Sequence, residues 1–167
     1  MFEALKKHLK RGGVKREEIL APVEGMAVPL SEVKDPAFSE EILGKGMAII
    51  PSKGRIVAPV NGVLSVMFET MHAVSITADN GAEVMIHVGL DTVTLKGEGY
   101  RSFKKQGDAV KAGELLLEFE LEEIKRKGYD LITPVIILNT GEFPDMECHV
   151  GKKVKELEPI IELQVVK

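Results

Sequence analysis

The chain has 167 residues, of which 44% are apolar and 29% charged, so it suits one folded domain and is not a largely disordered chain. Its net charge of −4 argues against a nucleic-acid-binding protein, and no apolar run approaches the roughly 18 residues of a membrane-spanning helix. The single cysteine excludes an internal disulfide, and no secretion signal opens the sequence, so we expect a cytoplasmic location.

Residues 1–18 form a basic segment that differs from the rest of the chain. They hold six basic residues against three acids, a charge of +3, which leaves −7 for residues 19–167. Apolar residues recur there at helical spacing with lysines between them: Phe2, Leu5 and Leu9. We expect either a frayed, solvated leader or an amphipathic helix in residues 1–11 that touches an anionic membrane surface. A single domain is then expected over residues 19–167.

Short β-type runs separated by turn residues dominate after residue 19. The runs predict strands at 48–50, 62–68, 73–77, 83–88, 115–120, 135–138 and 160–166. The sequence Asp79-Asn80-Gly81 predicts a hairpin turn between the third and fourth of these strands. Residues 121–127 favour a helix, and residues 38–43 a short helical turn. We therefore predict an all-β sandwich or barrel with short helices.

Two pairs of similar segments indicate an internal duplication. Residues 21–25 (APVEG) recur as residues 58–62 (APVNG), 37 positions later. Residues 107–119 align with residues 151–163, 44 positions later, and each copy combines two turns with an alternating strand. Two copies are too few for a solenoid, so the pattern predicts a duplicated β unit folded onto itself.

His72 and His87 are the histidines best placed for chemistry. His8 lies in the basic leader, and His149 with the neighbouring cysteine cannot make a metal site alone. The hairpin turn at residues 79–81 lets the segments that carry His72 and His87 pair antiparallel. Both imidazoles could then lie together.

Strand alternation places further side chains on the face of the two imidazoles. In a strand over residues 83–88, Met85 shares a face with His87, while Val84, Ile86 and Val88 face the core. In the preceding segment, every second residue would share one face of a strand: Phe68, Thr70, His72, Val74 and Ile76. We expect a surface with two histidines, a threonine hydroxyl and apolar surroundings.

Two neighbouring imidazoles support two kinds of chemistry. A neutral ring nitrogen can accept a phosphoryl group and release it, while the second imidazole donates a hydrogen bond to the phosphoryl oxygens. Thr70 would then fix the tautomer of its neighbour, His72. Alternatively His72 and His87 could hold Zn²⁺, with a third ligand from Asp91 or from a partner.

Longer motifs around these residues resemble the enzyme IIA component of the glucose family of the phosphoenolpyruvate-dependent sugar phosphotransferase system. They are HVGLDTV at 87–93, ETMHAVSI at 69–76, VAPVNG at 57–62 and DPAFSEEILGKG at 35–46. The resemblance extends from residue 20 to the C-terminus. It implies an antiparallel β-sandwich with a duplicated hybrid motif, which agrees with the repeats.

The resemblance also implies a function. His87 would accept a phosphoryl group from phosphorylated HPr on Nε2 and pass it to a cysteine of the IIB domain of a sugar permease, without a cofactor. By motif position, His72 would stabilise the phosphoryl oxygens and Thr70 would hydrogen-bond to His72. Other residues match the surface that docks these basic partners: Asp35, Phe38, Phe68, Val74, Met85, Val88 and Asp91.

Two alternative functions stay open. Zinc peptidases of the lysostaphin type share the duplicated hybrid motif, and His87 with Asp91 satisfies the H-x-x-x-D half of their ligand pattern. They also need a later H-x-H, and His149 has no histidine two residues away. A regulatory binder switched by phosphorylation of His87 is the other alternative, and it is compatible with a phosphocarrier.

Overall fold

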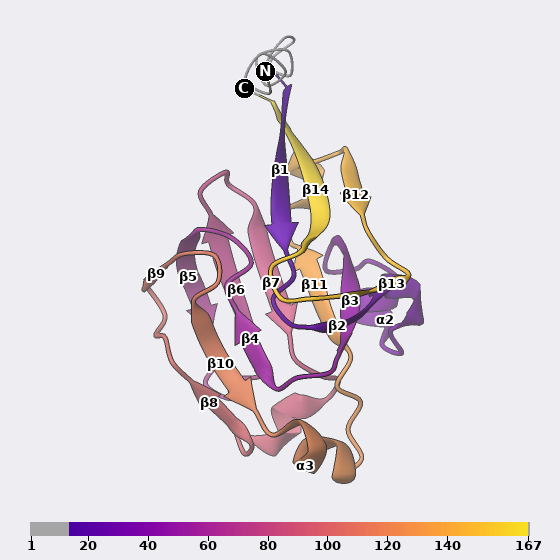
Figure 1. The fold of residues 1–167 in the computed structure, drawn as a ribbon, viewed down its shortest axis with the longest axis vertical. Helices are drawn as coiled ribbons and strands as arrows, with labels where there is room; N and C mark the ends of the chain where they lie inside the picture. The colour runs from indigo at the N-terminus through magenta and orange to yellow at the C-terminus, as the bar shows by residue number, and fades with distance from the viewer. Residues whose placement is uncertain (1–13, 167) are drawn as a thin grey trace.

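The computed structural model describes residues 14–166, which form antiparallel sheets joined by short helices (Figure 1). The strands of this part are β1 (Val14–Leu20), β2 (Gly25–Pro29), β3 (Lys45–Pro51), β4 (Arg55–Val57), β5 (Gly62–Met67), β6 (Ala73–Ala78), β7 (Glu83–His87), β8 (Tyr100–Ser102), β9 (Ala109–Val110), β10 (Leu115–Phe119), β11 (Thr133–Ile137), β12 (Met146–Cys148), β13 (Lys152–Val154) and β14 (Pro159–Val166). The helices there are η2 (Leu30–Glu32), α2 (Pro36–Ser39), η3 (Thr92–Leu95), α3 (Leu121–Arg126) and η4 (Thr140–Glu142). Within these residues, no helix has both the length and the apolar character needed to cross a membrane.

The described strands form one large sheet and two small ones. The large sheet has eight strands in the order β13-β2-β3-β11-β7-β6-β5-β9, and the small sheets are β4-β10-β8 and β1-β14-β12. One face of the large sheet packs against the small sheets in the main core, which includes Ile49, Leu64, Ile76 and Ile86 of the large sheet with Ile56 and Leu117. This arrangement confirms the predicted antiparallel β-sandwich.

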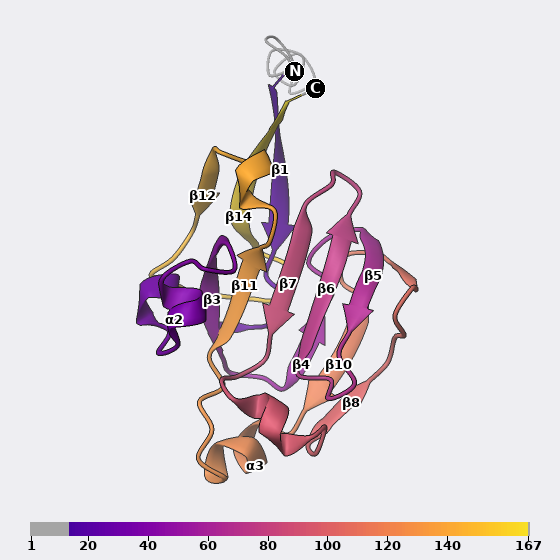
Figure 2. The same cartoon turned by 180° about the vertical axis from the view of Figure 1, so that it is seen from behind.

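A second apolar cluster lies on the opposite face of the large sheet. Neighbouring residues of β7 alternate between the clusters, since Val84 and Ile86 belong to the main core and Met85 to the second cluster. Figure 2 shows this face, with α2 beside β3. Phe38 of α2 packs in the second cluster and is buried. The helix therefore covers the face of the sheet toward which His87 was predicted to point.

The predicted strands correspond to long strands of the structure. All seven are found, as β3, β5, β6, β7, β10, β11 and β14, and the predicted helix is α3. The strands that sequence reasoning missed are mostly two or three residues long, such as β4, β9 and β13. So few residues show no periodicity, and their strand conformation depends on partners far away in the sequence.

The start of the domain differs from the prediction. Strand β1 begins at Val14 and pairs with β14, so residues 14–18 belong to the folded domain rather than to the leader. Arg16 Nη1 lies 2.9 Å from a carboxylate oxygen of Glu162 across the ribbon. The change in charge was therefore a poor guide to the boundary, because exposed strand positions tolerate charge. The predicted membrane contact of residues 1–11 lies outside the described residues.

Reciprocal hydrogen bonds show how the duplicated units fit together. The Leu20 N–H donates to the Pro59 carbonyl at 3.0 Å, and the Val57 N–H donates to the Pro22 carbonyl at 2.9 Å. Leu20 and Val57 are 37 positions apart, and so are Pro22 and Pro59. Each bond is thus the counterpart of the other under the sequence repeat. The exchange confirms a duplicated unit folded onto itself.

The second pair of repeats follows the same symmetry. The Ala58 N–H donates to the Glu114 carbonyl, and the Ala21 N–H donates to the Glu158 carbonyl, both at 2.8 Å. Leu157 occupies the position that corresponds to Gly113, and it keeps a left-handed φ of 74°. A leucine in that region is strained, but its N–H still donates to the Ala21 carbonyl. The repeat therefore retains its turn without the glycine.

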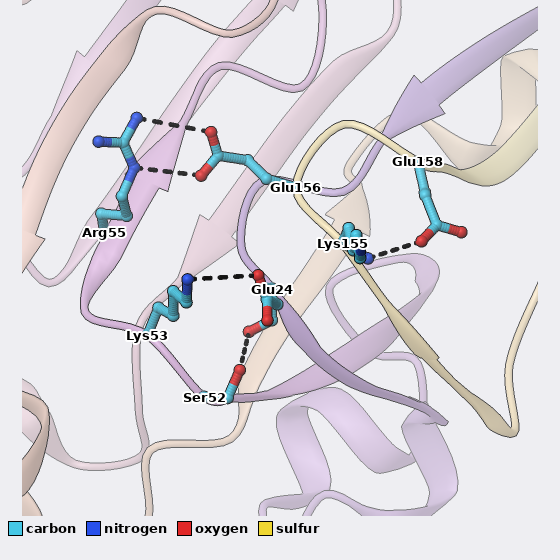
Figure 3. A network of polar contacts seen from close by, with 7 residues as sticks. All are labelled: Glu24, Ser52, Lys53, Arg55, Lys155, Glu156 and Glu158. Atoms are coloured by element: carbon cyan, nitrogen blue, oxygen red, sulfur yellow. Dashed lines mark hydrogen bonds and ion pairs between the residues drawn. The ribbon is translucent and has the colours of Figure 1, made fainter.

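Polar side chains join the turns where the two units meet (Figure 3). Arg55 Nε lies 3.1 Å from Glu156 Oε1, and Lys53 Nζ lies 3.7 Å from Glu24 Oε1. The Ser52 hydroxyl donates to the Glu24 carbonyl at 3.2 Å. Exposed pairs of this kind contribute little stability. The buried strands between the units, rather than these pairs, hold the sandwich together.

Candidate functional site

The β6–β7 hairpin carries both histidines at its open end. The predicted turn is present, since the Gly81 N–H donates to the Ala78 carbonyl at 2.9 Å. His87 ends β7, His72 directly precedes β6, and the ring centroids are 4.9 Å apart with planes at 85°. The view of Figure 2 shows β7 ending where β6 begins. Antiparallel pairing thus brings the imidazoles together, as the sequence predicted.

His72 reaches this position through a turn, not by strand alternation. Met71 has a left-handed φ of 61°, and its N–H donates to the Phe68 carbonyl at 2.8 Å. This turn breaks the period of two before β6 begins. As a result His72 lies beside His87, while Val74 pairs with Ile86 and faces the main core.

Several residues predicted to dock partners are buried. Val74 and Val88 have no exposed surface, so the structure contradicts a docking role for both. Phe38 and Met85 retain only 3% and 8% exposure and pack in the second cluster. The Phe38 ring lies 5.1 Å from the His87 ring, so it forms a wall of the site. The motif resemblance gave no sign that Phe38 and Met85 would be buried, because their burial depends on α2 covering the sheet face.

Other apolar side chains are exposed beside His72 or on segments that flank the site residues in the sequence. Phe68 is 42% exposed, and its ring lies 5.3 Å from the His72 ring. Sequence reasoning missed Ile42, Leu43 and Val93, which are 68%, 40% and 49% exposed. Ile42 and Leu43 follow α2, and Val93 lies in η3 shortly after the His87 loop. An apolar pair within the polar run SEEILGKG was the available signal.

The hydrogen bond of His87 determines which of its ring nitrogens is free. Nδ1 lies 2.7 Å from the Gly89 carbonyl oxygen, which can only accept, so Nδ1 carries the proton. In the neutral ring Nε2 then has the lone pair. Burial lowers the pKa of His87 below 6.5, opposed by the Gly89 bond and by the charges of Asp35 and Asp91. At neutral pH His87 is therefore a neutral nucleophile.

His72 is a buried neutral imidazole. Its Nδ1 lies 2.5 Å from the Thr70 hydroxyl oxygen. Burial, with a further contribution from the nearby His87, lowers the pKa of His72 from 6.5 to about 4. When the Thr70 hydroxyl donates to Nδ1, the ring proton resides on Nε2, where it is available as a donor. Thr70 is thus placed as the sequence predicted, against His72.

The two predicted acids sit in different settings. Asp35 caps α2, since its Oδ1 accepts from the Ala37 N–H at 3.0 Å. Asp91 is exposed and precedes η3 with a left-handed φ of 60°. Both carboxylates raise the pKa of His87 through their charge. They therefore place negative charge near a ring that becomes positive when it is protonated.

The structure provides few protein ligands for a metal ion. Among residues 14–166, no group of three or more histidine, cysteine, aspartate or glutamate side chains is placed to hold one. A tetrahedral Zn²⁺ site uses at least three protein ligands. Zinc at His72 and His87 thus stays a prediction that needs a ligand from a partner.

A known protein family matches most of this domain. The family model described as phosphoenolpyruvate-dependent sugar phosphotransferase system, EIIA 1, matches residues 17–143. The chain belongs to this EIIA family. The match contains both histidines, Thr70 and the acids, and it confirms the family that the sequence motifs indicated.

Relatives of the EIIA family are similar over most of this chain. The glucose-specific EIIA component of Oceanobacillus iheyensis is 43% identical over 147 residues, which cover 88% of each chain. The beta-glucoside-specific EIIBCA component of Bacillus subtilis is 46% identical over 148 residues, but the chain spans only 24% of its length. Glucose permease IIA from Mycoplasma capricolum is a structural neighbour with a TM-score of 0.84 and 36% identity, covering 89% of this chain and 96% of that chain.

We expect the buried state of His72 to make the EIIA domain less stable in acid. The unfolded chain binds a proton at His72 below about pH 6.5, whereas the folded chain does so only near pH 4. Stability is thus fully present above pH 6.5 and falls as the pH drops toward 4, by on the order of 2 kcal/mol from this residue. His87 acts in the same direction, since its pKa is also lowered.

Two measurements check this pH dependence. NMR should show His72 titrating near pH 4, and denaturant unfolding should show a weaker loss of stability in His72→Gln than in the wild type between pH 6.5 and 4. A His72 midpoint at or above 6.5 would contradict the expectation.

Proposed function

We propose that this chain is a phosphocarrier, in which His87 Nε2 accepts a phosphoryl group from phosphorylated HPr and passes it to a cysteine of a IIB domain. The observation that carries the proposal is the bond between His87 Nδ1 and the Gly89 carbonyl, 2.7 Å long. It holds the proton on one ring nitrogen and leaves a lone pair on the other. A neighbouring neutral imidazole, which can donate a hydrogen bond, completes the arrangement.

Each transfer exchanges one bond to phosphorus for another. On acceptance, the bond between phosphorus and the donor nitrogen breaks as the bond to His87 Nε2 forms, and the donor nitrogen keeps the electron pair. The His87 ring then becomes cationic, and the Gly89 carbonyl stabilises its Nδ1 proton. His72 Nε2–H would donate to the phosphoryl oxygens. On release, a thiolate attacks phosphorus and His87 recovers its lone pair.

The exposed surface around the histidines suits protein partners. Phe68 supplies exposed apolar area at His72, the segments after α2 and in η3 add Ile42, Leu43 and Val93, and Asp35 and Asp91 add negative charge at His87. Apolar patches of this kind mark sites of protein contact, and acids favour a basic partner. The Bacillus subtilis relative is named an EIIBCA component, which supports a IIB domain as one partner.

We place the carrier in sugar uptake, in the cytoplasm, without assigning the sugar. The Oceanobacillus relative is named glucose-specific, whereas the Bacillus relative is named beta-glucoside-specific. Both share the EIIA domain with this chain. In this proposal the permease, not the carrier, selects the sugar, because the phosphoryl group is all that the carrier holds.

Intact mass spectrometry tests the proposal. The protein is mixed with phosphoenolpyruvate, enzyme I and HPr, and we expect it to gain one phosphoryl group that is lost in acid, as a phosphohistidine would be. HPr alone in the same mixture serves as the control for a competent donor. If HPr is charged and this chain stays unmodified, the proposed function is wrong.

A further inference from the structure

The peptide of Val88 links the two histidines. Val88 follows His87 directly, and its N–H donates to the carbonyl of His72 at 2.7 Å. Its side chain is fully buried in the main core. The next carbonyl, that of Gly89, accepts the Nδ1 proton of His87. The peptide between Val88 and Gly89 joins these two hydrogen-bonded groups, so a displacement of its backbone shifts both the carbonyl that supports His87 and the amide that contacts His72.

Two buried hydroxyls hold the carbonyl of Val88. The Thr92 hydroxyl donates to it at 2.8 Å and the Tyr100 hydroxyl at 2.9 Å. Thr92 is fully buried and Tyr100 is 7% exposed. Burial raises the pKa of Tyr100 to about 12, so its hydroxyl keeps the proton that it donates. Both lone pairs of the carbonyl are thus used by side chains from η3 and β8.

The segment after His87 needs such support because the sheet no longer provides it. Strand β7 ends at His87, and Gly89 and Asp91 both adopt left-handed φ values, 92° and 60°. The Leu90 N–H donates to the Asp130 carbonyl at 2.9 Å, which ties the loop to the segment before β11. Between the end of β7 and Leu90, the Thr92 and Tyr100 hydroxyls set the orientation of the Val88 carbonyl.

We propose that Thr92 and Tyr100 are positioning residues for phosphoryl transfer, because their hydroxyls fix the Val88 peptide and with it the relative placement of His72 and His87. The inference rests on the proposed function. Neither side chain touches the phosphoryl group, so both act through the backbone. Group transfer is sensitive to small displacements of the reacting atoms, so a loosened peptide slows the reaction without weakening the docking of the donor.

Paired substitutions distinguish the effect of losing a hydroxyl from the effect of disturbing the packing around it. Thr92→Val removes the hydroxyl and keeps the shape, Thr92→Ser keeps the hydroxyl, and Tyr100→Phe removes the second donor. Tyr129→Phe is the matched control, because the Tyr129 hydroxyl contacts the Thr94 hydroxyl oxygen at 2.7 Å rather than Val88. The rate of phosphorylation is measured against the concentration of phosphorylated HPr, together with the hydrogen exchange of the Val88 amide and the thermal midpoint.

We expect Thr92→Val to lower the maximal rate about tenfold and Tyr100→Phe about threefold, with KM changed less than about twofold. Thr92→Ser should restore most of the rate, and Tyr129→Phe should match the wild type. The Val88 amide should exchange at least about threefold faster in Thr92→Val than in the wild type.

Several results would overturn the inference. Wild-type rates in both Thr92→Val and Tyr100→Phe would do so, as would an equal loss in Thr92→Ser, which would assign the effect to packing. If Thr92→Val fails to fold, Tyr100→Phe and its control decide. A wild-type protein that takes up no phosphoryl group refutes the proposed function instead, and the Val88 exchange then shows separately whether the hydroxyls hold the loop.

Discussion

The His87→Gln variant is expected to take up no phosphoryl group from phosphorylated HPr. Glutamine can keep a hydrogen bond to the Gly89 carbonyl, but its amide nitrogen has no lone pair able to attack phosphorus. The half-buried position of His87 at the end of β7 leaves the rest of the hairpin intact. Intact mass spectrometry after incubation with phosphoenolpyruvate, enzyme I and HPr measures the loss directly.

His149→Gln is the matched control for this substitution. The Nε2 atom of His149 lies 3.1 Å from Glu162 Oε2 on the β14 side of the domain, away from the β6–β7 hairpin. The His149→Gln variant should take up one phosphoryl group, as the wild type does. If His87→Gln were phosphorylated as fully as the wild type and His149→Gln were not, His149 would be the acceptor and the proposed mechanism would be wrong.

His72→Gln is expected to separate the two half-reactions. Acceptance needs mainly the lone pair of His87, so the variant should still become phosphorylated. Release requires an anionic thiolate to approach a charged phosphoryl group, and the His72 Nε2–H would offset that charge. We therefore expect transfer to a IIB domain to slow by about a hundredfold or more.

A single-turnover experiment measures the release step. The variant is loaded, separated from its donor and mixed with a IIB domain, and the decay of the phosphorylated species is followed. Thr70→Val is a graded companion, because it leaves the His72 ring in place and removes only the hydroxyl that lies 2.5 Å from Nδ1. We expect it to slow release less than His72→Gln does. Release by His72→Gln at the wild-type rate would exclude the assigned role of His72.

The alternation of side chains predicted β7 correctly and failed before β6. In β7 the period of two holds, and Val84 and Ile86 face the core while Met85 faces the other way. Before β6, Met71 is left-handed and His72 lies in a bend outside the strand, so the alternation that holds for Val74 does not extend to His72. Parity arguments extend only as far as the strand, because a positive φ redirects the chain.

Burial of the docking candidates shows a second limit of local reasoning. The sequence motifs placed Phe38 and Met85 near the site, which is correct. They also predicted that both side chains would contact partners. In the structure α2 covers this face of the sheet, and both side chains are buried in the second apolar cluster. The exposed apolar residues are instead Ile42 and Leu43, which follow α2, and Val93 in η3. Exposure depends on which elements cover a face, and that is not a local property.

Local sequence patterns were enough to predict the long strands, the hairpin at residues 79–81, the duplication and the pair of histidines at the site. These features depend on short-range periodicity, turn residues and repeated motifs, which a single chain displays directly. Three further results came from the folded structure alone: which side chains are exposed, how far burial lowers the pKa of His72, and that the Thr92 and Tyr100 hydroxyls donate to the Val88 carbonyl. Each of these results depends on contacts between segments distant in the chain. Burial and hydrogen-bond geometry created by such contacts cannot be predicted from a local sequence pattern.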